Sequence, residues 1–214
     1  MPRYNILIGC DQLYFDIWGL PLLRRIQYHS PWINLHCHIV NPIHDNQYDN
    51  INITTERKSF VSLDSKLSYL QAVRFLIVAN KFENNDYIVT LDADSICTSH
   101  FTQSDFSHLF DKQYILYHQK AHRWLAGFVT FCNNNFAQEF AYALNCKPVD
   151  LWTYGRDQYV LSKLANKYKF KILPEKWMSI GKNKINSYFL TLKGNQKYKE
   201  KYLTKFKNYK DSIK

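Results

Sequence analysis

Short apolar runs alternate with longer amphipathic stretches along most of this 214-residue chain, and this alternation is the strongest constraint on its fold. The apolar runs are short enough for buried strands and lie at residues 4–10, 35–40, 86–91, 114–118, 126–132 and 170–173. The stretches with helical periodicity lie at residues 15–29, 63–82, 134–144 and 156–168. Strands that alternate with helices are typical of a mostly parallel sheet covered by helices on both faces. The sequence therefore predicts an α/β fold with one domain at residues 1–192.

Positive charge is concentrated in the last quarter of the chain. Residues 1–162 contain 13 Lys and Arg against 15 Asp and Glu, whereas residues 163–214 contain 15 Lys against three acidic residues. Such a segment favours an anionic partner. Nucleic acid is a disfavoured partner, because the segment lacks arginine, the side chain that base and phosphate recognition prefers.

The tail at residues 193–214 also has an apolar stripe at helical spacing. Its members are Tyr198, Tyr202, Phe206, Tyr209 and Ile213, and lysines occupy many of the other positions. The spacing predicts a basic amphipathic helix. A tyrosine-rich stripe packs well and inserts weakly, which favours docking on the chain's own domain. Contact with an anionic membrane or with another protein is the alternative.

Cysteine and histidine usage argues against structural metal sites and disulfides. The five cysteines are widely spaced and form no C-x-x-C pair. His36 and His38 share one face of the strand at 35–40, but without nearby ligands they are expected to be core or cleft histidines. No apolar segment approaches the ~20 residues that a membrane span needs. We expect a soluble, cytoplasmic protein, with the basic tail as its one candidate for peripheral membrane contact.

Two carboxylates follow the apolar run at 86–91. In extended backbone, Asp92 and Asp94 point to the same side and Ala93 to the other. The carboxyl end of a parallel strand is where open α/β sheets bind ligands, and paired carboxylates there suit Mn²⁺ or Mg²⁺. The alternative is a turn in which Asp92 or Asp94 caps the next helix.

Glycine-rich phosphate-binding loops are absent from the sequence. None of the six glycines forms G-x-G-x-x-G or G-x-x-x-x-G-K-[ST], so a bound diphosphate would need a metal ion and lysines for its neutralisation. This combination resembles the GT-A nucleotide-sugar glycosyltransferases, and within them glycosyltransferase family eight, in patches over residues 5–184. The resemblance implies a GT-A fold, a Mn²⁺ or Mg²⁺ cofactor, and transfer of a hexosyl or deoxyhexosyl group from a donor expected to be UDP-linked. The acceptor is a glycan or another hydroxyl compound.

Two upstream motifs carry the nucleotide end of this resemblance. "DQLY" is similar to a family D-x-x-Y motif, which implies that Asp11 contacts uracil and that Tyr14 stacks on it. A carboxylate that accepts an imide N–H and an aromatic face beside a base are both chemically reasonable. Arg74, eighteen residues before Asp92, resembles an arginine that reaches the donor sugar. The alternatives are a surface turn for D-x-x-Y and a salt-bridged surface residue for Arg74.

Two further motifs resemble the sugar end of the family site. "LAGFVTFCN" matches a strand in which Ala126 and Gly127 leave room for the sugar, although Leu125 replaces the asparagine of the family. "RDQYVLSKL" resembles an element that implies Asp157 and Gln158 lie near the reacting carbon. Asp157 would be the general base in an inverting reaction, and both residues would stabilise the donor's positive transition state in a retaining one. The alternative for Asp157 is a helix N-cap.

The last motif concerns the diphosphate. "MSIGKNK" resembles the family's H-x-x-G-x-x-K through Gly181 and Lys184, and Lys182 is a second candidate for the leaving diphosphate. Met178 stands where the family has its metal-binding histidine. A third metal ligand would therefore come from phosphate, water or another residue.

Two other classes of function compete with a glycosyltransferase. A haloacid-dehalogenase-like phosphohydrolase also uses D-x-D after a strand, but it normally has that motif on the first strand and needs a later G-D-x-x-x-D-type motif, which this sequence lacks. A non-catalytic module that binds an anionic ligand through the basic tail would bind in a salt-sensitive manner without Asp92 and Asp94.

Overall fold

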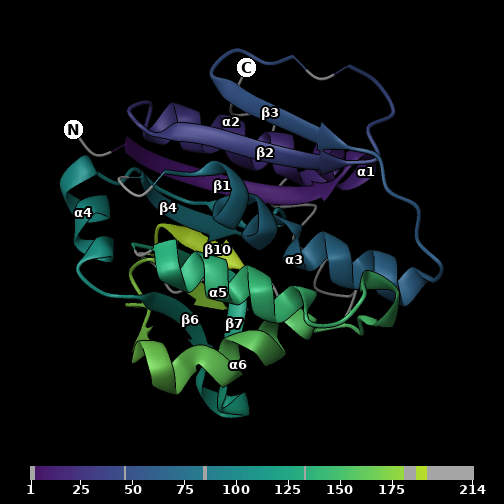
Figure 1. Ribbon diagram of the computed structural model, residues 1–214. Helices are drawn as coiled ribbons and strands as arrows, with labels where there is room; N and C mark the ends of the chain where they lie inside the picture. Colours follow the sequence, from purple (N-terminus) through teal and green to yellow (C-terminus); the bar gives the residue numbers. More distant parts are fainter. Residues whose placement is uncertain (1–2, 46, 84–85, 133, 181–186, 192–214) are drawn as a thin grey trace.

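The computed structural model describes residues 3–45, 47–83, 86–132, 134–180 and 187–191. Its centre is a sheet of seven strands in the order β3-β2-β1-β4-β7-β6-β8 (Figure 1). The strands are β1 (Arg3–Asp11), β2 (Asn34–Val40), β3 (Ile51–Glu56), β4 (Asp86–Leu91), β6 (Tyr114–His118), β7 (Arg123–Phe131) and β8 (Lys171–Ile172). The α/β class is thus confirmed.

The sheet is mixed, which refines the expectation of a mostly parallel one. β3, β2, β1 and β4 pair in parallel, and so do β6 and β8. β7 runs antiparallel to both of its neighbours, β4 and β6. An antiparallel partner needs no helical crossover, so the sequence from β6 to β7 can turn back through the short helical turn Gln119–Ala121. Apolar pattern alone cannot reveal this reversal, because β7 is buried along most of its length.

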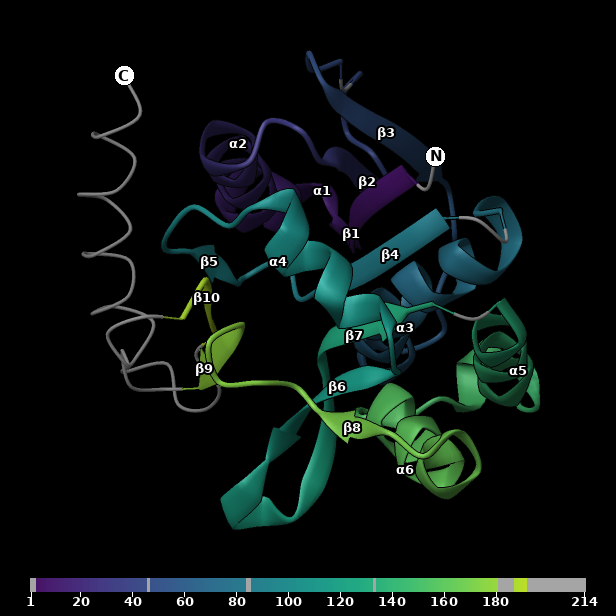
Figure 2. The same cartoon turned by 90° about the vertical axis from the view of Figure 1, so that its left-hand side faces the viewer.

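Helices cover both faces of the sheet, as the alternation predicted. α2 (Leu20–His29) and α4 (Gln103–Ser107) contribute to one apolar core, and α3 (Leu63–Lys81), α5 (Asn134–Asn145) and α6 (Arg156–Tyr168) to the other. Figures 1 and 2 show the two groups on opposite sides of the strands. Among the helices that the structure describes, none combines the length and apolarity needed to cross a membrane.

Helix boundaries agree with the sequence pattern except at two starts. The stretch 15–29 divides into a π-helical turn, Phe15–Gly19, and α2, whose first turn accommodates Pro21. α3 is capped by Ser62, whose hydroxyl oxygen accepts from the amide of Ser65 while the Ser65 side chain bonds back to Ser62. Asp64 and Ser65 are therefore inside the helix, because the reciprocal capping box begins at Ser62, one residue before the helix starts.

β3 was not expected from the sequence. Its segment, INITTE, alternates weakly, and Ile51 is its one buried residue because β3 forms the edge of the sheet. A second, three-stranded sheet was also missed; its strands are β5 (Ile96–Cys97), β9 (Met178–Ile180) and β10 (Phe189–Thr191), in the order β5-β10-β9. Strands of two or three residues carry too few apolar positions to show a period.

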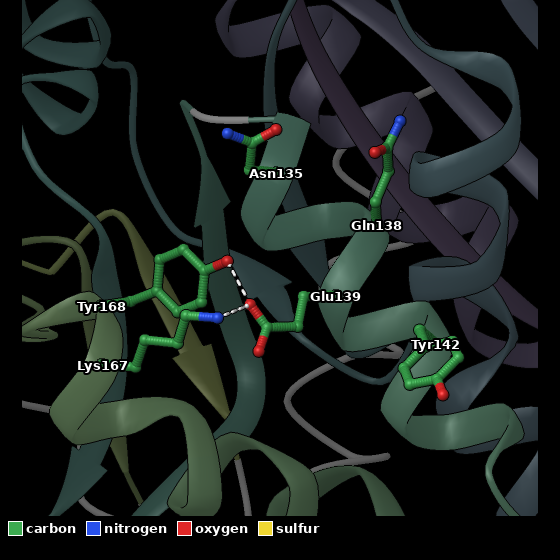
Figure 3. A pocket seen from close by; sticks show the side chains of 6 residues that line it. All are labelled: Asn135, Gln138, Glu139, Tyr142, Lys167 and Tyr168. Carbon is green, nitrogen blue, oxygen red and sulfur yellow. Dashed lines mark hydrogen bonds and ion pairs between the residues drawn. The ribbon is translucent and has the colours of Figure 1, made fainter.

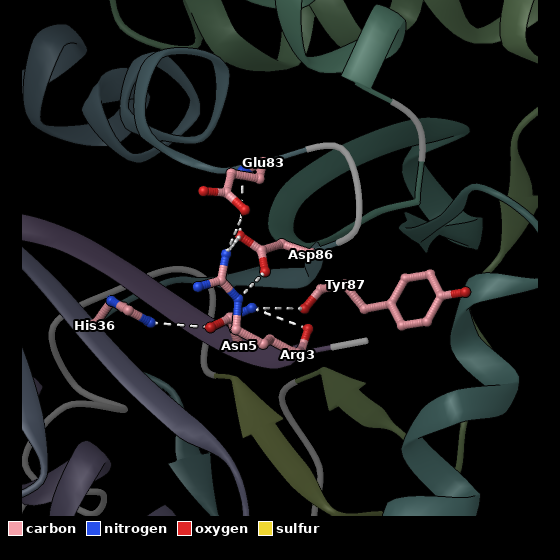
Figure 4. Close-up of polar contacts among 6 residues, drawn as sticks. All are labelled: Arg3, Asn5, His36, Glu83, Asp86 and Tyr87. Carbon is pink, nitrogen blue, oxygen red and sulfur yellow. Dashed lines mark hydrogen bonds and ion pairs between the residues drawn. The ribbon is translucent and has the colours of Figure 1, made fainter. Parts of the chain in front are cut away.

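A polar cluster fixes the amino ends of the central strands (Figure 4). The guanidinium of Arg3 donates to Asp86 at 2.7 Å and to Glu83 at 3.0 Å. Oδ1 of Asn5 accepts a hydrogen bond from Nε2 of His36 at 3.0 Å. His36 and His38 are bonded to Asn5 and to the Thr54 hydroxyl, respectively, as expected for core histidines.

Candidate functional site

The candidate site lies where the order of the sheet changes direction. From β1 the chain proceeds to β2 and β3 on one side, whereas β4 lies on the other side of β1. Such a switch point leaves a crevice at the carboxyl ends of the two flanking parallel strands. Asp11 is the last residue of β1, and Asp92 directly follows β4. The two predicted motifs, DQLY and D-x-D, therefore start at neighbouring strand ends.

Asp92 and Asp94 lie on a tight turn rather than on a continued strand. The amide of Ser95 donates to the carbonyl of Asp92 at 3.0 Å, and Ala93 is buried. No helix follows; the chain enters β5 at Ile96. The backbone is therefore not extended through Asp94, and neither carboxylate caps a helix. Both residues nevertheless lie directly after the end of β4.

Asp92 is paired with a buried arginine. Nη2 of Arg74 lies 2.7 Å from Oδ1 of Asp92, and it also donates to the carbonyl of Ala126 at 2.9 Å. The Arg74 side chain is only 3% exposed. The positive charge that the D-x-D segment lacks in its own sequence thus comes from α3, eighteen residues earlier. Arg74 is salt-bridged, but in the interior; its contact with a donor sugar stays a prediction.

Close packing of α3 on β1 places Arg74 there. A Cβ at Gly9 would lie 2.8 Å from Cγ1 of Val73 and 3.2 Å from the backbone nitrogen of Arg74. Only a residue without a side chain leaves α3 this close to the strand. Gly9 is therefore part of what positions the Arg74–Asp92 pair.

Asp94 has a different partner from Asp92. The hydroxyl of Tyr14 donates to Oδ2 of Asp94 at 2.7 Å. Tyr14 lies on α1 (Gln12–Tyr14), a single turn whose N-cap is Asp11: Oδ1 of Asp11 accepts from the Tyr14 amide at 3.0 Å. The structure thus brings Asp11 and Tyr14 together with Asp94. Stacking of Tyr14 on a base stays a prediction.

Lys66 is a site residue that sequence reasoning missed. Its Nζ lies 3.1 Å from Oδ2 of Asp11. A signal was present: Lys66 precedes Arg74 by eight residues on α3, so both lie near one stripe of the helix. The pair leaves a cation next to the carboxylate that was predicted to contact the base.

Ala126 and Gly127 lie on a bulge in β7. Ile115 pairs with Val129 whereas the next residue, Leu116, pairs with Leu125, so residues 126–128 have no partner in β6. Bulges of this kind redirect backbone groups and are common beside active sites. Here the amide of Asp92 donates to the Gly127 carbonyl at 3.1 Å.

Gly127 makes room for the carboxylate of Asp92. A Cβ at this position would lie 2.7 Å from Oδ2 of Asp92. The sequence resemblance predicted that this small residue leaves room for a sugar. In the structure, a small residue is needed at Gly127 because of the nearby Asp92 carboxylate. The contact of Ala126 and Gly127 with a sugar stays a prediction.

Asp157 and Gln158 lie in the first turn of α6. The N-cap is Gly155, in left-handed backbone with φ of 83°, so the alternative that Asp157 caps the helix is wrong. Asp157 is 3% exposed, and its Oδ1 accepts from the Gln158 amide at 2.7 Å. The Gly155 amide donates to Oε1 of Gln71 at 3.4 Å, which holds the start of α6 against α3 one turn before Arg74. A buried carboxylate at a helix start is favoured by the helix dipole.

The diphosphate motif is only partly described. Met178, on β9, is 3% exposed and packs in the apolar core with Trp177 and Phe189. The thioether therefore belongs to the core rather than to a ligand set. Gly181, Lys182 and Lys184, and the tail at 193–214, lie outside the described residues.

Among the described residues, Asp92 and Asp94 are the two candidate carboxylate ligands for a cation. In the described ranges, no three His, Cys, Asp or Glu side chains come together as a metal site. Asp92 and Asp94 are hard oxygen ligands of the kind that Mg²⁺ and Mn²⁺ prefer, and such ions commonly take their other ligands from substrate phosphate and water. The donor set fits a cation that arrives with a phosphorylated substrate.

A surface pocket lies between α5 and α6, away from these residues (Figure 3). Its volume is about 630 Å³, and its lining residues are Asn135, Gln138, Glu139, Tyr142, Lys167 and Tyr168. Oε2 of Glu139 accepts from Lys167 and from the Tyr168 hydroxyl, both at 2.6 Å. Burial and the neighbouring Glu139 raise the pKa of Tyr168 to about 12. The pocket lies near the end of β7 and the start of β8. Asp92 lies at the other end of these strands, because it follows β4, which is antiparallel to β7.

Comparisons with protein-family models and with curated proteins find no match for this chain.

Proposed function

We propose that the protein is a metal-dependent glycosyltransferase of the GT-A type, which transfers a sugar from a nucleotide donor, UDP-linked, to a glycan or another hydroxyl acceptor. One observation carries this proposal. Tyr14, on the helical turn α1 directly after β1, hydrogen-bonds to Asp94, on the turn directly after β4. The nucleotide motif and the metal motif, 80 residues apart in sequence, thus form one site at the switch point.

The α/β architecture is compatible with the GT-A assignment. A sheet with parallel strands β3-β2-β1-β4 and helices on both faces leaves its ligand crevice at one edge. The antiparallel strand β7 brings Gly127 against Asp92 at that edge. The composition of the crevice, with two metal-type carboxylates, a lysine and an aromatic side chain, suits a nucleoside diphosphate better than an uncharged ligand.

In this proposal the residues have distinct roles. Asp92 and Asp94 hold the cation, and Asp11 and Tyr14 bind the base. A bound Mn²⁺ or Mg²⁺ would supply positive charge for the departing diphosphate. Lys182 and Lys184 are assigned to the same diphosphate by sequence resemblance.

Asp157 is the proposed catalytic carboxylate, with Gln158 beside it. Asp157 is buried in the first turn of α6, and the start of this helix is bonded to α3 through Gln71. In an inverting reaction it would accept the proton of the acceptor hydroxyl; in a retaining one it would stabilise positive charge on the donor. The anomeric configuration of the product distinguishes these two roles.

A thermal-shift panel tests the nucleotide assignment. Mn²⁺ with UDP is expected to raise the melting temperature more than Mn²⁺ with GDP or CDP, because a ligand that binds only the folded state stabilises it in proportion to its affinity. Tyr14→Ala should remove most of the UDP preference. Equal shifts for all three nucleotides would contradict the base assignment, and release of phosphate from simple phosphomonoesters would instead support a phosphohydrolase.

A further inference from the structure

The hydroxyl of Tyr14 occupies a position between the two halves of the site. It donates to Oδ2 of Asp94 at 2.7 Å, which is the length of a strong bond to a charged acceptor. The backbone amide of the same residue donates to Asp11. Tyr14 is therefore bonded at its amide end to the β1 carboxylate and at its hydroxyl end to the D-x-D carboxylate.

Apolar packing fixes the ring between these two bonds. Tyr14 packs against a small cluster formed by Trp18, Ile96 and Leu190, and its ring centroid lies 6.4 Å from that of Trp18. Ile96 belongs to β5 and lies two residues after Asp94, so the ring packs against the strand that directly follows the turn of Asp94. The tyrosine ring can then transmit a displacement of α1 to Asp94.

The two carboxylates are held by chemically different partners. Arg74 contributes a full positive charge to Asp92, whereas Tyr14 contributes a neutral hydroxyl to Asp94. A hydroxyl donor orients a carboxylate and does not itself neutralise the negative charge.

We infer that the Tyr14 hydroxyl is a positioning group for Asp94, which sets cation affinity and couples cation binding to nucleotide binding in the loop after β1. This inference rests on the proposed function. It assigns Tyr14 a role that its ring alone cannot fill: the ring serves the base, and the hydroxyl serves the metal-binding carboxylate.

A Mn²⁺ titration followed by the electron paramagnetic resonance signal of free Mn²⁺ tests the inference on the full chain, with and without UDP. Tyr14→Phe keeps the ring and its packing and removes only the hydroxyl. Tyr168→Phe is the matched control, because it removes a hydroxyl that donates to Glu139 at 2.6 Å in the pocket between α5 and α6.

Tyr14→Phe is expected to weaken Mn²⁺ binding roughly 10-fold, at the lower end of the effect of groups that orient metal ligands, and Tyr168→Phe to leave it unchanged. UDP should tighten Mn²⁺ binding in the wild type and do so less in Tyr14→Phe, while UDP affinity without metal stays the same in both.

The outcomes separate the inference from the proposed function. Wild-type Mn²⁺ affinity and an unchanged UDP effect in Tyr14→Phe would overturn the inference and leave the proposed function in place. No Mn²⁺ binding by the wild type in the presence of UDP would overturn both. A lower melting temperature of Tyr14→Phe with unaltered Mn²⁺ binding would show a structural role only, which also contradicts the inference.

Discussion

Asp92 and Asp94 are two residues apart in sequence, yet their carboxylates bond to different kinds of side chain. The carboxylate of Asp92 pairs with the buried guanidinium of Arg74, and its backbone amide donates to the Gly127 carbonyl. The missing side chain of Gly127 leaves space for this carboxylate. Asp94 is held by a tyrosine hydroxyl. Loss of charge at Asp92 would leave Arg74 as an uncompensated buried cation, which is among the costly changes in a protein interior. At Asp94 the bonded Tyr14 hydroxyl carries no charge.

Gly127→Ala should destabilise the protein by about 1–3 kcal/mol, the usual range for an inserted methyl group that meets well-packed atoms. The reason is the 2.7 Å approach of the new Cβ to Oδ2 of Asp92. Thermal or chemical unfolding measures the effect.

The control for Gly127→Ala is the same substitution in an Asp92→Ala background, where the clashing carboxylate is gone. A double-mutant cycle should then show a favourable coupling between the two changes. An equal loss of stability in both backgrounds would mean that Gly127 is needed for another reason.

The contacts of α3 show how an element positions a site. This helix contributes Arg74 to Asp92, Lys66 to Asp11 and Gln71 to Gly155, so a single rigid body fixes three loops at the sheet edge. Its approach to β1 depends on Gly9. Periodicity predicted the helix and its length well, because its ends coincide with a polar cap and the buried strand β4. The residues that it presents to the site depend on the rotation of the helix against the sheet, which the sequence leaves undetermined.

Gly9→Ala should push α3 away from β1. A Cβ there would meet Cγ1 of Val73 at 2.8 Å and the backbone of Arg74 at 3.2 Å, so we expect a loss of about 1–3 kcal/mol in the free energy of unfolding. Val73→Ala in the Gly9→Ala protein removes the nearer contact, so the double variant should lose less stability than the sum of the two single variants. The contact with the backbone of Arg74 remains, so the gain should be partial. Full additivity of the two substitutions would contradict this account of the packing.

At the scale of the whole molecule, the sequence predicted the class of fold and the main elements, and it predicted that DQLY and D-x-D mark strand ends. Both sets follow from local patterns: apolar runs, helical spacing and carboxylates after a strand. The reversed strand β7, the edge strand β3 and the small sheet β5-β10-β9 were not predictable in this way, because they depend on pairing between distant segments. The same holds for Lys66 and for the hydrogen bond from Tyr14 to Asp94.

The acid sensitivity of the fold should depend in part on His36. Burial lowers the pKa of His36 to about 4, against a value near 6.5 in the unfolded chain. Between these values the unfolded state binds more protons, so the free energy of unfolding should fall as pH is lowered from about 6.5 to about 4. The share of His36 between pH 7 and pH 5 is at most about 2 kcal/mol.

Chemical denaturation of the wild type and of His36→Gln at pH 7 and pH 5 measures that share. Glutamine can keep a hydrogen bond to Asn5 and does not titrate, so the variant should lose less stability on acidification than the wild type. An identical loss in both proteins would show that His36 contributes nothing to the pH dependence.

The central claim is that Asp94 holds a cation that the protein needs to act on a nucleotide-sugar donor. The most direct measurement is the rate of UDP release from UDP-hexoses, with Mn²⁺ and with chelator, for the wild type, Asp94→Asn and the control Asp105→Asn, whose carboxylate pairs with Lys176 at 2.7 Å outside the site. We predict Mn²⁺-dependent release by the wild type and by Asp105→Asn, and none by an Asp94→Asn protein that remains folded. Release by Asp94→Asn at the wild-type rate with saturating donor would contradict the claim.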